Sequence, residues 1–339
     1  MFREYLLPII KYSIENRTIY IPRFNLNTLK KLVSYRVAKT PIAIMIEPAC
    51  ACNIQCPLCT TPHKYMSRKQ GIMEFKTFQK LLNDVKDFVL VFYLNFAGEP
   101  FLNPHLFKMV DEATKHNILS LVDTNATLLT DERIREILDS ELNILIINVD
   151  HIKKDHFENF RKGAKFESTM QGIKKLCEIK KKEKRFFPLV MAEIIVSREN
   201  EQHLQDIYDY AINELGVNGA WFKSLCFPLH SKGFRDDHNI KALVDKYLPL
   251  KSSVKRYNYI NGDLQLINPK EFCDWEHKSL IMWDGRVSAC CYDYDGAYTF
   301  GNINNRSFLD IWNSKKYRYY REKMIKNKKL SICERCSIL

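Results

Sequence analysis

Apolar and polar residues alternate along residues 41–225 in two repeating kinds of segment. Short runs rich in Ile, Val, Phe and Tyr predict six strands, at 42–46, 89–96, 119–124, 144–149, 189–196 and 220–222. Apolar residues at helical spacing predict helices between them, some preceded by capping residues such as Thr130, near 74–87, 104–116, 130–139, 168–184 and 200–215. This alternation predicts an α/β fold with a continuous parallel sheet, open or curled into part of a barrel, and function at the carboxyl ends of its strands.

The segments on either side have different patterns. Apolar residues at helical spacing over 26–38, with Lys and Arg between them, predict a basic amphipathic helix in an N-terminal extension, residues 1–40. Packing of this helix against the main domain is favoured over peripheral contact with a membrane. Residues 226–270 predict a connector with one helix around 240–247. Residues 271–339 predict a hairpin around 283–286 and a basic helix from 307 to about 327.

Composition and charge exclude several classes of protein. Of the 339 residues, 46% are hydrophobic and 12% are aromatic, so the chain can bury a large core and is not disordered. No apolar run approaches the ~20 residues of a membrane-spanning helix, and no signal peptide is recognised, which predicts a cytoplasmic protein. The net charge of +12 lies at the two ends, 1–40 and 306–329. Basic ends suit an anionic substrate, a nucleic acid or an anionic membrane face, and a solubilising surface explains them equally well.

The cysteines point to metal or redox chemistry. There are eleven, an odd number in a chain without an export signal, so a disulfide framework explains them poorly. Seven fall into two spaced sets: Cys52, Cys56 and Cys59, then Cys273, Cys290, Cys333 and Cys336. The other four can pack as small buried hydrophobic residues: Cys50, Cys177, Cys226 and Cys291.

The first set follows the first predicted strand with the spacing C-x3-C-x2-C. A structural zinc site needs four ligands, and this run supplies three. Three thiolates on a four-iron cluster leave one iron open to chelate another molecule, as a chemically active cluster requires. The run resembles the motif of the radical S-adenosylmethionine (SAM) enzymes. The resemblance implies a [4Fe-4S] cluster on Cys52, Cys56 and Cys59 whose open iron binds SAM. Cys50 is then a bystander, or a ligand if the register is shifted.

Further motifs similar to those of this family follow at the ends of the next strands. The resemblance implies that Glu99 contacts the SAM amino group, that Arg161 meets its carboxylate, and that Ile194 packs on adenine. The chain departs from the family patterns Gly-Gly-Glu-Pro and Ser-Ile-Asp-Gly at Ala97 and His151, among others. The implied SAM contacts are Gly98, Glu99, Pro100, Thr124, Asn125, Asn148, Asp150, Arg161 and Ile194.

The second cysteine set supplies four possible ligands. Cys273 and Cys290 flank the predicted hairpin, whose turn holds Gly285, and a closing C-x2-C supplies the other two cysteines. Four thiolates saturate a four-iron cluster or a zinc ion. The segment resembles a truncated SPASM domain, called "twitch", of radical SAM enzymes. The resemblance implies one auxiliary [4Fe-4S] cluster on Cys273, Cys290, Cys333 and Cys336, with zinc as the alternative metal and Cys291 as an alternative to Cys290.

The resemblance implies a partial (β/α)6 TIM-like barrel over 41–225, followed by a small α+β cluster-binding domain at 271–339. It also implies that the reduced cluster cleaves SAM to methionine and a 5′-deoxyadenosyl radical, which takes a hydrogen from the substrate. We expect a flavodoxin- or ferredoxin-type electron donor. We also expect a small-molecule substrate, such as a carbohydrate, nucleotide sugar or lipid-linked intermediate, that is oxidised through the auxiliary cluster.

Other functions stay open at this point. An epimerase would need a thiol that returns hydrogen to the substrate, and Cys226, just after the sixth predicted strand, is the candidate. A peptide-modifying enzyme would share the same motifs. An iron-sulfur protein that binds nucleic acid would use the basic ends, and a ferredoxin-like carrier would only transfer electrons, but neither needs a three-cysteine site with an open iron.

Overall fold

The computed structural model describes residues 40–63, 65–229, 231–235, 240–251, 253–267, 273–325, 331–333 and 336. The helix predicted at 26–38 lies outside the described residues. Among those that are described, no helix is long and apolar enough to cross a membrane.

A nine-stranded sheet in the order β11-β10-β9-β1-β2-β3-β4-β5-β6 runs through the described residues. Strands β1 to β6 are neighbours in chain order and pair in parallel, which confirms the α/β partial barrel. The sheet does not close there, since β6 and β11 are its two edges. The six strands are β1 (Ala43–Ile46), β2 (Val91–Leu94), β3 (Leu119–Thr124), β4 (Ile144–Asn148), β5 (Leu189–Val196) and β6 (Gly219–Ser224).

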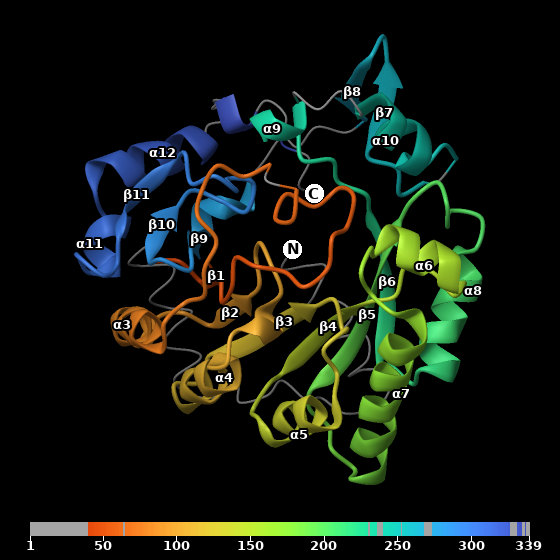
Figure 1. Cartoon of the computed structure of the whole chain (residues 1–339). Coiled ribbons are helices and arrows are strands. Elements are labelled where there is room, and N and C mark those ends of the chain that lie inside the picture. The colour runs from red at the N-terminus through yellow and green to blue at the C-terminus, as the bar shows by residue number, and fades with distance from the viewer. Residues whose placement is uncertain are drawn as a thin grey trace.

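Amphipathic helices follow the outer side of these strands (Figure 1). They are α3 (Phe75–Val85), α4 (Leu106–Lys115), α5 (Asp131–Asp139), α6 (Lys154–Phe160), α7 (Phe166–Lys182) and α8 (Leu204–Asp209). The Thr130 hydroxyl accepts the Arg133 N–H and caps α5 as predicted. The helix predicted at 200–215 is shorter, because α8 passes into a π-helical turn, Tyr210–Glu214.

The C-terminal segment extends the same sheet. Strand β9 (Lys278–Ile281) pairs in parallel with β1 and antiparallel with β10 (Arg286–Ser288), and β11 (Thr299–Asn302) completes this edge. The predicted basic helix is two helices, α11 (Phe308–Trp312) and α12 (Lys315–Ile325). Asn313 caps the end of α11, and the Ser314 hydroxyl accepts the Tyr317 N–H at the start of α12.

The connector holds more structure than the sequence analysis predicts. It contains α9 (Lys232–Arg235), α10 (Ile240–Tyr247) and an antiparallel hairpin of β7 (Tyr257–Ile260) and β8 (Asp263–Leu266). Asn261 and Gly262 join the two strands with φ of 51° and 82°, which is the signature of a type I′ turn. Short 3-10 turns occur at Pro100–Leu102, Asp274–His277 and Ser331–Cys333.

Candidate functional site

The first three cysteines lie close together in the loop after β1. Cys52, Cys56 and Cys59 are all half-buried, and the Cys59 N–H donates to the Cys56 carbonyl at 3.0 Å. Burial raises the pKa of the Cys52 thiol to about 12, and the neighbouring Glu99, Cys59 and Cys56 raise it further. Thiols with such neighbours become ligands when a metal stabilises their thiolates.

Gly98 allows the end of β2 to press against this loop. Its φ is +100°, and a Cβ there would lie 2.4 Å from the Ala49 carbonyl oxygen and 2.5 Å from that of Ala51. The next residue, Glu99, donates its N–H to the Ala51 carbonyl at 2.7 Å. Only glycine fits this close approach, which holds the Glu99 side chain beneath the cysteine loop.

The Glu99 carboxylate is buried and accepts three hydrogen bonds. The Thr124 hydroxyl donates at 2.7 Å, the Asn125 N–H at 2.9 Å and the Phe101 N–H at 3.1 Å, and Pro100 begins the turn that presents Phe101. Burial raises the pKa of Glu99. A carboxylate can accept about four hydrogen bonds, so one acceptor position is left for a donor outside the protein.

Asn125 connects this carboxylate to the first cysteine. Its side-chain Nδ2 lies 3.7 Å from the Cys52 sulfur and donates to Asn53 at 3.0 Å. Glu99, Asn125 and Cys52 therefore form one side of the site.

The Arg161 guanidinium forms the opposite side. Its Nε donates to Asp150 at 2.7 Å, and its Nη1 lies 3.9 Å from the Cys56 sulfur. Its Nη2 is buried and has no hydrogen-bond partner among the residues that the structure describes. Burial alone would lower the pKa of Arg161, but Asp150 and Cys56 raise it above its ordinary value. The other Asp150 oxygen accepts the Ile195 N–H at 2.8 Å, so both oxygens of this carboxylate are engaged.

A cavity of about 460 Å³ lies beside the cysteine loop. This volume falls within the range typical of small-molecule sites. Its lining is largely polar and includes Cys52, Asn53, Gln55, Thr61, Arg68 and Gln70. The cavity, the open Nη2 of Arg161 and the spare acceptor position on Glu99 make this end of the barrel suitable for a charged cofactor beside a metal cluster.

Polar side chains also follow the inner face of the sheet, where an (α/β) barrel is usually filled by apolar residues. Asn148 lies opposite Glu193 in the register, and the Lys223 ammonium lies 2.8 Å from the Glu193 carboxylate. Burial and the neighbouring Glu193 raise the pKa of half-buried Asp123 to about 7. Asp123, Glu193 and Lys223 were not predicted as site residues; the signal that could have found them is a charged residue within a strand.

The same register corrects the expectation for Ile194. Successive side chains of a strand point to opposite faces, so Ile194 points away from Glu193 and lies, 0% exposed, in the main hydrophobic core. Ile195 shares the face of Glu193 and is partly exposed. An apolar contact from β5 to a molecule inside the barrel would therefore come from Ile195.

His151, the residue after Asp150, is held neutral. Burial lowers its pKa to about 4, its ring lies 5.3 Å from that of His156, and its Nε2 has no hydrogen-bond partner. It adds a second unpaired polar atom close to Arg161.

The second cysteine set also converges. Burial raises the pKa of Cys290 well above its ordinary value, and Cys291, Cys336 and Cys273 raise it further. The Cys336 N–H donates to the Cys333 carbonyl at 3.1 Å, which closes the C-x2-C turn. Within the described parts of the chain, no three Cys, His, Asp or Glu side chains could hold a single metal ion.

Two buried donors without partners lie next to this set. The Tyr320 hydroxyl and the Trp275 Nε1 are both buried, and neither meets an acceptor in the described part of the chain. Trp275 is two residues from Cys273, and the turn that carries it packs against α12, which carries Tyr320. Unsatisfied buried donors around four thiols fit a group that offers acceptors, as the sulfurs of an iron-sulfur cluster do.

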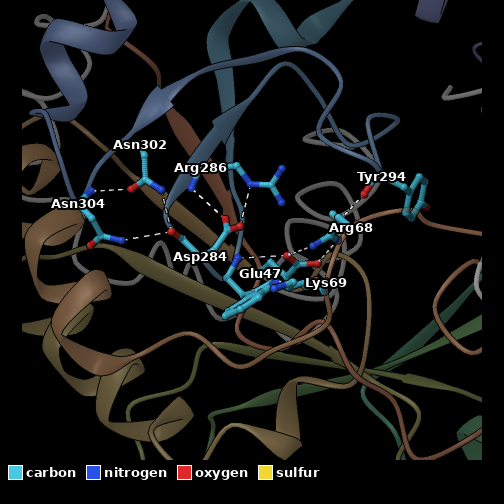
Figure 2. A network of polar contacts seen from close by, with 9 residues as sticks. Glu47, Arg68, Lys69, Asp284, Arg286, Tyr294, Asn302 and Asn304 are labelled. Atoms are coloured by element: carbon cyan, nitrogen blue, oxygen red, sulfur yellow. Dashed lines mark hydrogen bonds and ion pairs between the residues drawn. The ribbon is translucent and has the colours of Figure 1, made fainter.

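A buried ion pair joins the two cysteine regions (Figure 2). The Glu47 carboxylate, at the end of β1, accepts two hydrogen bonds from Arg68, one at 2.8 Å, and the Trp283 N–H at 3.1 Å. Arg68 also donates to the Tyr294 carbonyl. Buried Cys50 donates to Glu47, and burial raises the pKa of this thiol to about 12, as suits a bystander rather than a metal ligand.

Cys226 is exposed two residues after β6. Its sulfur lies 3.6 Å from the Tyr257 hydroxyl and 3.7 Å from the Phe227 carbonyl oxygen. Burial raises the pKa of Tyr294, and Cys226, Cys291 and Cys59 raise it further, so the Tyr294 side chain lies near all three thiols. Cys226 therefore lies at the same end of the barrel as the first cysteine set.

Two protein-family models match the chain. Residues 46–211 match the model of the radical SAM superfamily, and residues 273–337 match that of SPASM, an iron-sulfur cluster-binding domain. A tungsten-containing aldehyde ferredoxin oxidoreductase cofactor-modifying protein of Pyrococcus furiosus is 26% identical over 87% of each chain. An AdoMet-dependent heme synthase of Methanosarcina barkeri is 23% identical over 88% of this chain and 90% of its own. A PqqA peptide cyclase of Bradyrhizobium diazoefficiens is 25% identical over 51% of this chain and 44% of its own.

Solved structures share the fold. Streptococcus suis SuiB bound to its precursor peptide SuiA has a TM-score of 0.62 and 13% identity, over 99% of this chain and 83% of that one. The protein anSMEcpe with bound AdoMet has a TM-score of 0.60 and 19% identity, over 87% of this chain and 83% of that one. At these identities the likeness is one of architecture.

Proposed function

The chain belongs to the radical SAM superfamily and carries a C-terminal SPASM-type domain, and we propose that it uses its cofactors to oxidise a small molecule held inside the barrel. Its cofactors are SAM, the [4Fe-4S] cluster of radical SAM enzymes and auxiliary iron-sulfur clusters. In this proposal Cys52, Cys56 and Cys59 hold the SAM-binding cluster. The auxiliary cluster is bound by Cys273, Cys290, Cys333 and Cys336.

The observation that carries this proposal is the pair of opposite charges on the two sides of the cysteine loop. Arg161 presents an unpaired Nη2 beside Cys56, and Glu99 keeps one acceptor position beneath Cys52. These groups suit the carboxylate and the ammonium of SAM. Asp150 is then a positioning residue, because both of its oxygens already hold Arg161 and the Ile195 N–H.

The remaining contacts follow the strand ends. Thr124 and Asn125 orient Glu99, Asn148 faces the ribose from β4, and Ile195 packs on the adenine in place of Ile194. When bound, the reduced cluster supplies the electron that cleaves SAM to methionine and a 5′-deoxyadenosyl radical, which takes a hydrogen from the substrate. The residues of this chain bind and orient the two molecules.

Two observations support a small-molecule substrate over a peptide. The relatives that align along nearly the whole chain are named for cofactor modification and heme synthesis, whereas the peptide cyclase aligns with about half of it. The polar inner face also suits a compact molecule, because Lys223 donates hydrogen bonds while Asp123 and Glu193 accept them. A carbohydrate or a nucleotide sugar offers matching hydroxyl groups.

Oxidation needs an electron acceptor and a base. The auxiliary cluster, when bound, supplies a one-electron acceptor. Asp123, whose pKa is raised to about 7, can accept the proton of a substrate hydroxyl at neutral pH. Epimerisation is the second candidate function, because exposed Cys226 follows the carboxyl end of β6 and could return a hydrogen to the substrate.

The test is anaerobic reconstitution followed by assay of SAM cleavage with dithionite. Two four-iron clusters predict about eight irons per chain, and changing Cys52, Cys56 and Cys59 together to Ala, the triple-Ala variant, should leave about four. Wild type should form 5′-deoxyadenosine, and the triple-Ala variant should form none. Cys177→Ala, a buried cysteine of α7 outside both sets, is the matched control and should keep both properties. A wild-type protein with about four irons and one zinc would disprove the auxiliary cluster.

A further inference from the structure

Tyr320 has a buried hydroxyl without a partner in the part of the chain that the structure describes. The residue lies on α12 and is 5% exposed, and its hydroxyl oxygen meets no donor or acceptor among the described residues. Its neighbour on the same helix, Tyr317, is satisfied, because its hydroxyl donates to Ser279 at 3.1 Å. A buried hydroxyl normally has a hydrogen-bond partner, since its desolvation is otherwise uncompensated.

Aromatic packing holds the Tyr320 ring in one place. The ring centroid lies 5.6 Å from that of Tyr298 and 5.1 Å from that of Phe300. This packing fixes the direction in which the hydroxyl points. The hydroxyl cannot reach an acceptor by a change of ring position without loss of these contacts.

The second cysteine set lies on elements that meet α12. The 3-10 turn that begins directly after Cys273 packs against this helix. Burial raises the pKa of Tyr320, and the charges of Cys290, Cys333 and Asp293 raise it further. Asp293 is already engaged, because it accepts the Ser288 hydroxyl at 2.6 Å and the N–H groups of Ala297 and Tyr298. Among the residues that the structure describes, this leaves the group bound by the cysteines as the acceptor for Tyr320.

We propose that the Tyr320 hydroxyl donates a hydrogen bond to a sulfur of the auxiliary cluster and thereby raises its reduction potential. This inference rests on the proposed cluster at the second cysteine set. A hydrogen bond to sulfur stabilises the reduced cluster more than the oxidised one, because the reduced cluster carries more negative charge. Tyr320 is thus a positioning residue that makes the cluster a better acceptor for the electron left on the substrate.

The test measures the auxiliary cluster alone, in the triple-Ala variant. Tyr320→Phe removes the hydroxyl and keeps the ring between Tyr298 and Phe300. The midpoint potential, followed by electron paramagnetic resonance during a redox titration, should become more negative. Tyr319→Phe is the matched control, because Tyr319 is the next residue of the same helix and is 59% exposed. The midpoint potential of the auxiliary cluster in the Tyr319→Phe variant should equal that in the triple-Ala variant.

A second measurement detects the hydrogen bond directly, again in the triple-Ala variant. After exchange into deuterated water, electron-nuclear double resonance of the reduced auxiliary cluster should detect a coupled deuteron whose signal is lost in Tyr320→Phe and kept in Tyr319→Phe. An unchanged potential and an unchanged deuteron signal, with about four irons still bound, would overturn the Tyr320 assignment alone. A triple-Ala variant that binds no iron would overturn the auxiliary cluster as well.

Discussion

Removal of Arg68 tests how the two cysteine regions are held together. The Arg68 and Glu47 side chains are 3% and 0% exposed, and their hydrogen bonds link the loop after the first cysteine set to the end of β1. Arg68→Met keeps most of the side-chain volume and removes the charge. The Glu47 carboxylate then stays buried with only the Trp283 N–H and the Cys50 thiol as donors.

The expected loss of stability is large for one residue. Breaking a buried ion pair by removing one partner costs about 3–5 kcal/mol, because the other charge is left uncompensated. Unfolding entropy scales with chain length and is roughly 0.7 kcal/mol per kelvin for 339 residues, so the midpoint of thermal unfolding should fall by about 4–7 °C. Adding Glu47→Gln to Arg68→Met should restore most of the lost stability, since no unpaired charge remains.

The loss should also depend on pH. Burial already raises the pKa of Glu47 from its ordinary value of 4.5, and loss of Arg68 must raise it further. An acid with a raised pKa in the folded state binds more protons when folded than when unfolded, so stability falls as pH rises through that window. Arg68→Met should therefore be close to wild type near pH 5 and show its full loss at pH 8.

The assay is anaerobic thermal unfolding followed by circular dichroism at both pH values. Lys175→Met is the matched control, because it breaks an exposed pair with Asp131 whose side chains are 48% and 79% exposed. Such a pair contributes at most about 1 kcal/mol, so this control should shift the midpoint by less than about 2 °C. An Arg68→Met midpoint within 2 °C of wild type at pH 8 would refute the reasoning.

Three further changes test the site. Arg161→Met should weaken SAM binding by about 1–3 kcal/mol at normal iron content, measured by calorimetry, and unchanged affinity would remove Arg161 from the site. Gly98→Ala should lower both iron content and thermal stability, because the added Cβ would lie 2.4 Å from a backbone oxygen. Gly262→Ala is the control, because Gly262 also has a positive φ but its added Cβ would meet nothing within 4 Å, so this variant should keep its iron. Equal losses in the two variants would contradict this explanation. Cys226→Ala should still form 5′-deoxyadenosine, because hydrogen abstraction does not need this thiol. If Cys226 is the hydrogen donor, the variant should no longer form the product that carries a carbon-bound deuterium in deuterated water. Unaltered product and turnover would favour the electron-transfer route.

Much of the fold could be predicted because the barrel strands are short apolar runs separated by amphipathic helices. The boundaries of β3 and β5 agree with the sequence-based prediction, since polar or turn-forming residues bound each run. The β7–β8 hairpin could also have been found, because Asn-Gly at 261–262 between two β-like runs is a strong hairpin signal.

Other features depend on tertiary structure and could not be predicted. The pairing of β9 with β1 joins segments more than 200 residues apart, and no local pattern specifies it. The face of Ile194 follows from strand register, because a shift of one residue exchanges the two faces of a strand. The raised pKa of Asp123 comes first from burial in the folded sheet and then from Glu193, which lies on a different strand.

The pairing of β9 with β1 has a consequence for how the two clusters work together. Ile46 lies opposite Ile281, and the Glu47 N–H donates to the Ile281 carbonyl at 2.9 Å, so the two strands leave the sheet side by side. The first cysteine set follows β1, and the hairpin that leads to Cys290 follows β9. Main-chain hydrogen bonds within one sheet, reinforced by the buried Glu47–Arg68 pair, therefore set the separation of the two sites. In the proposed oxidation, electron transfer from substrate to auxiliary cluster would then require no movement of one site against the other, because one continuous sheet holds both.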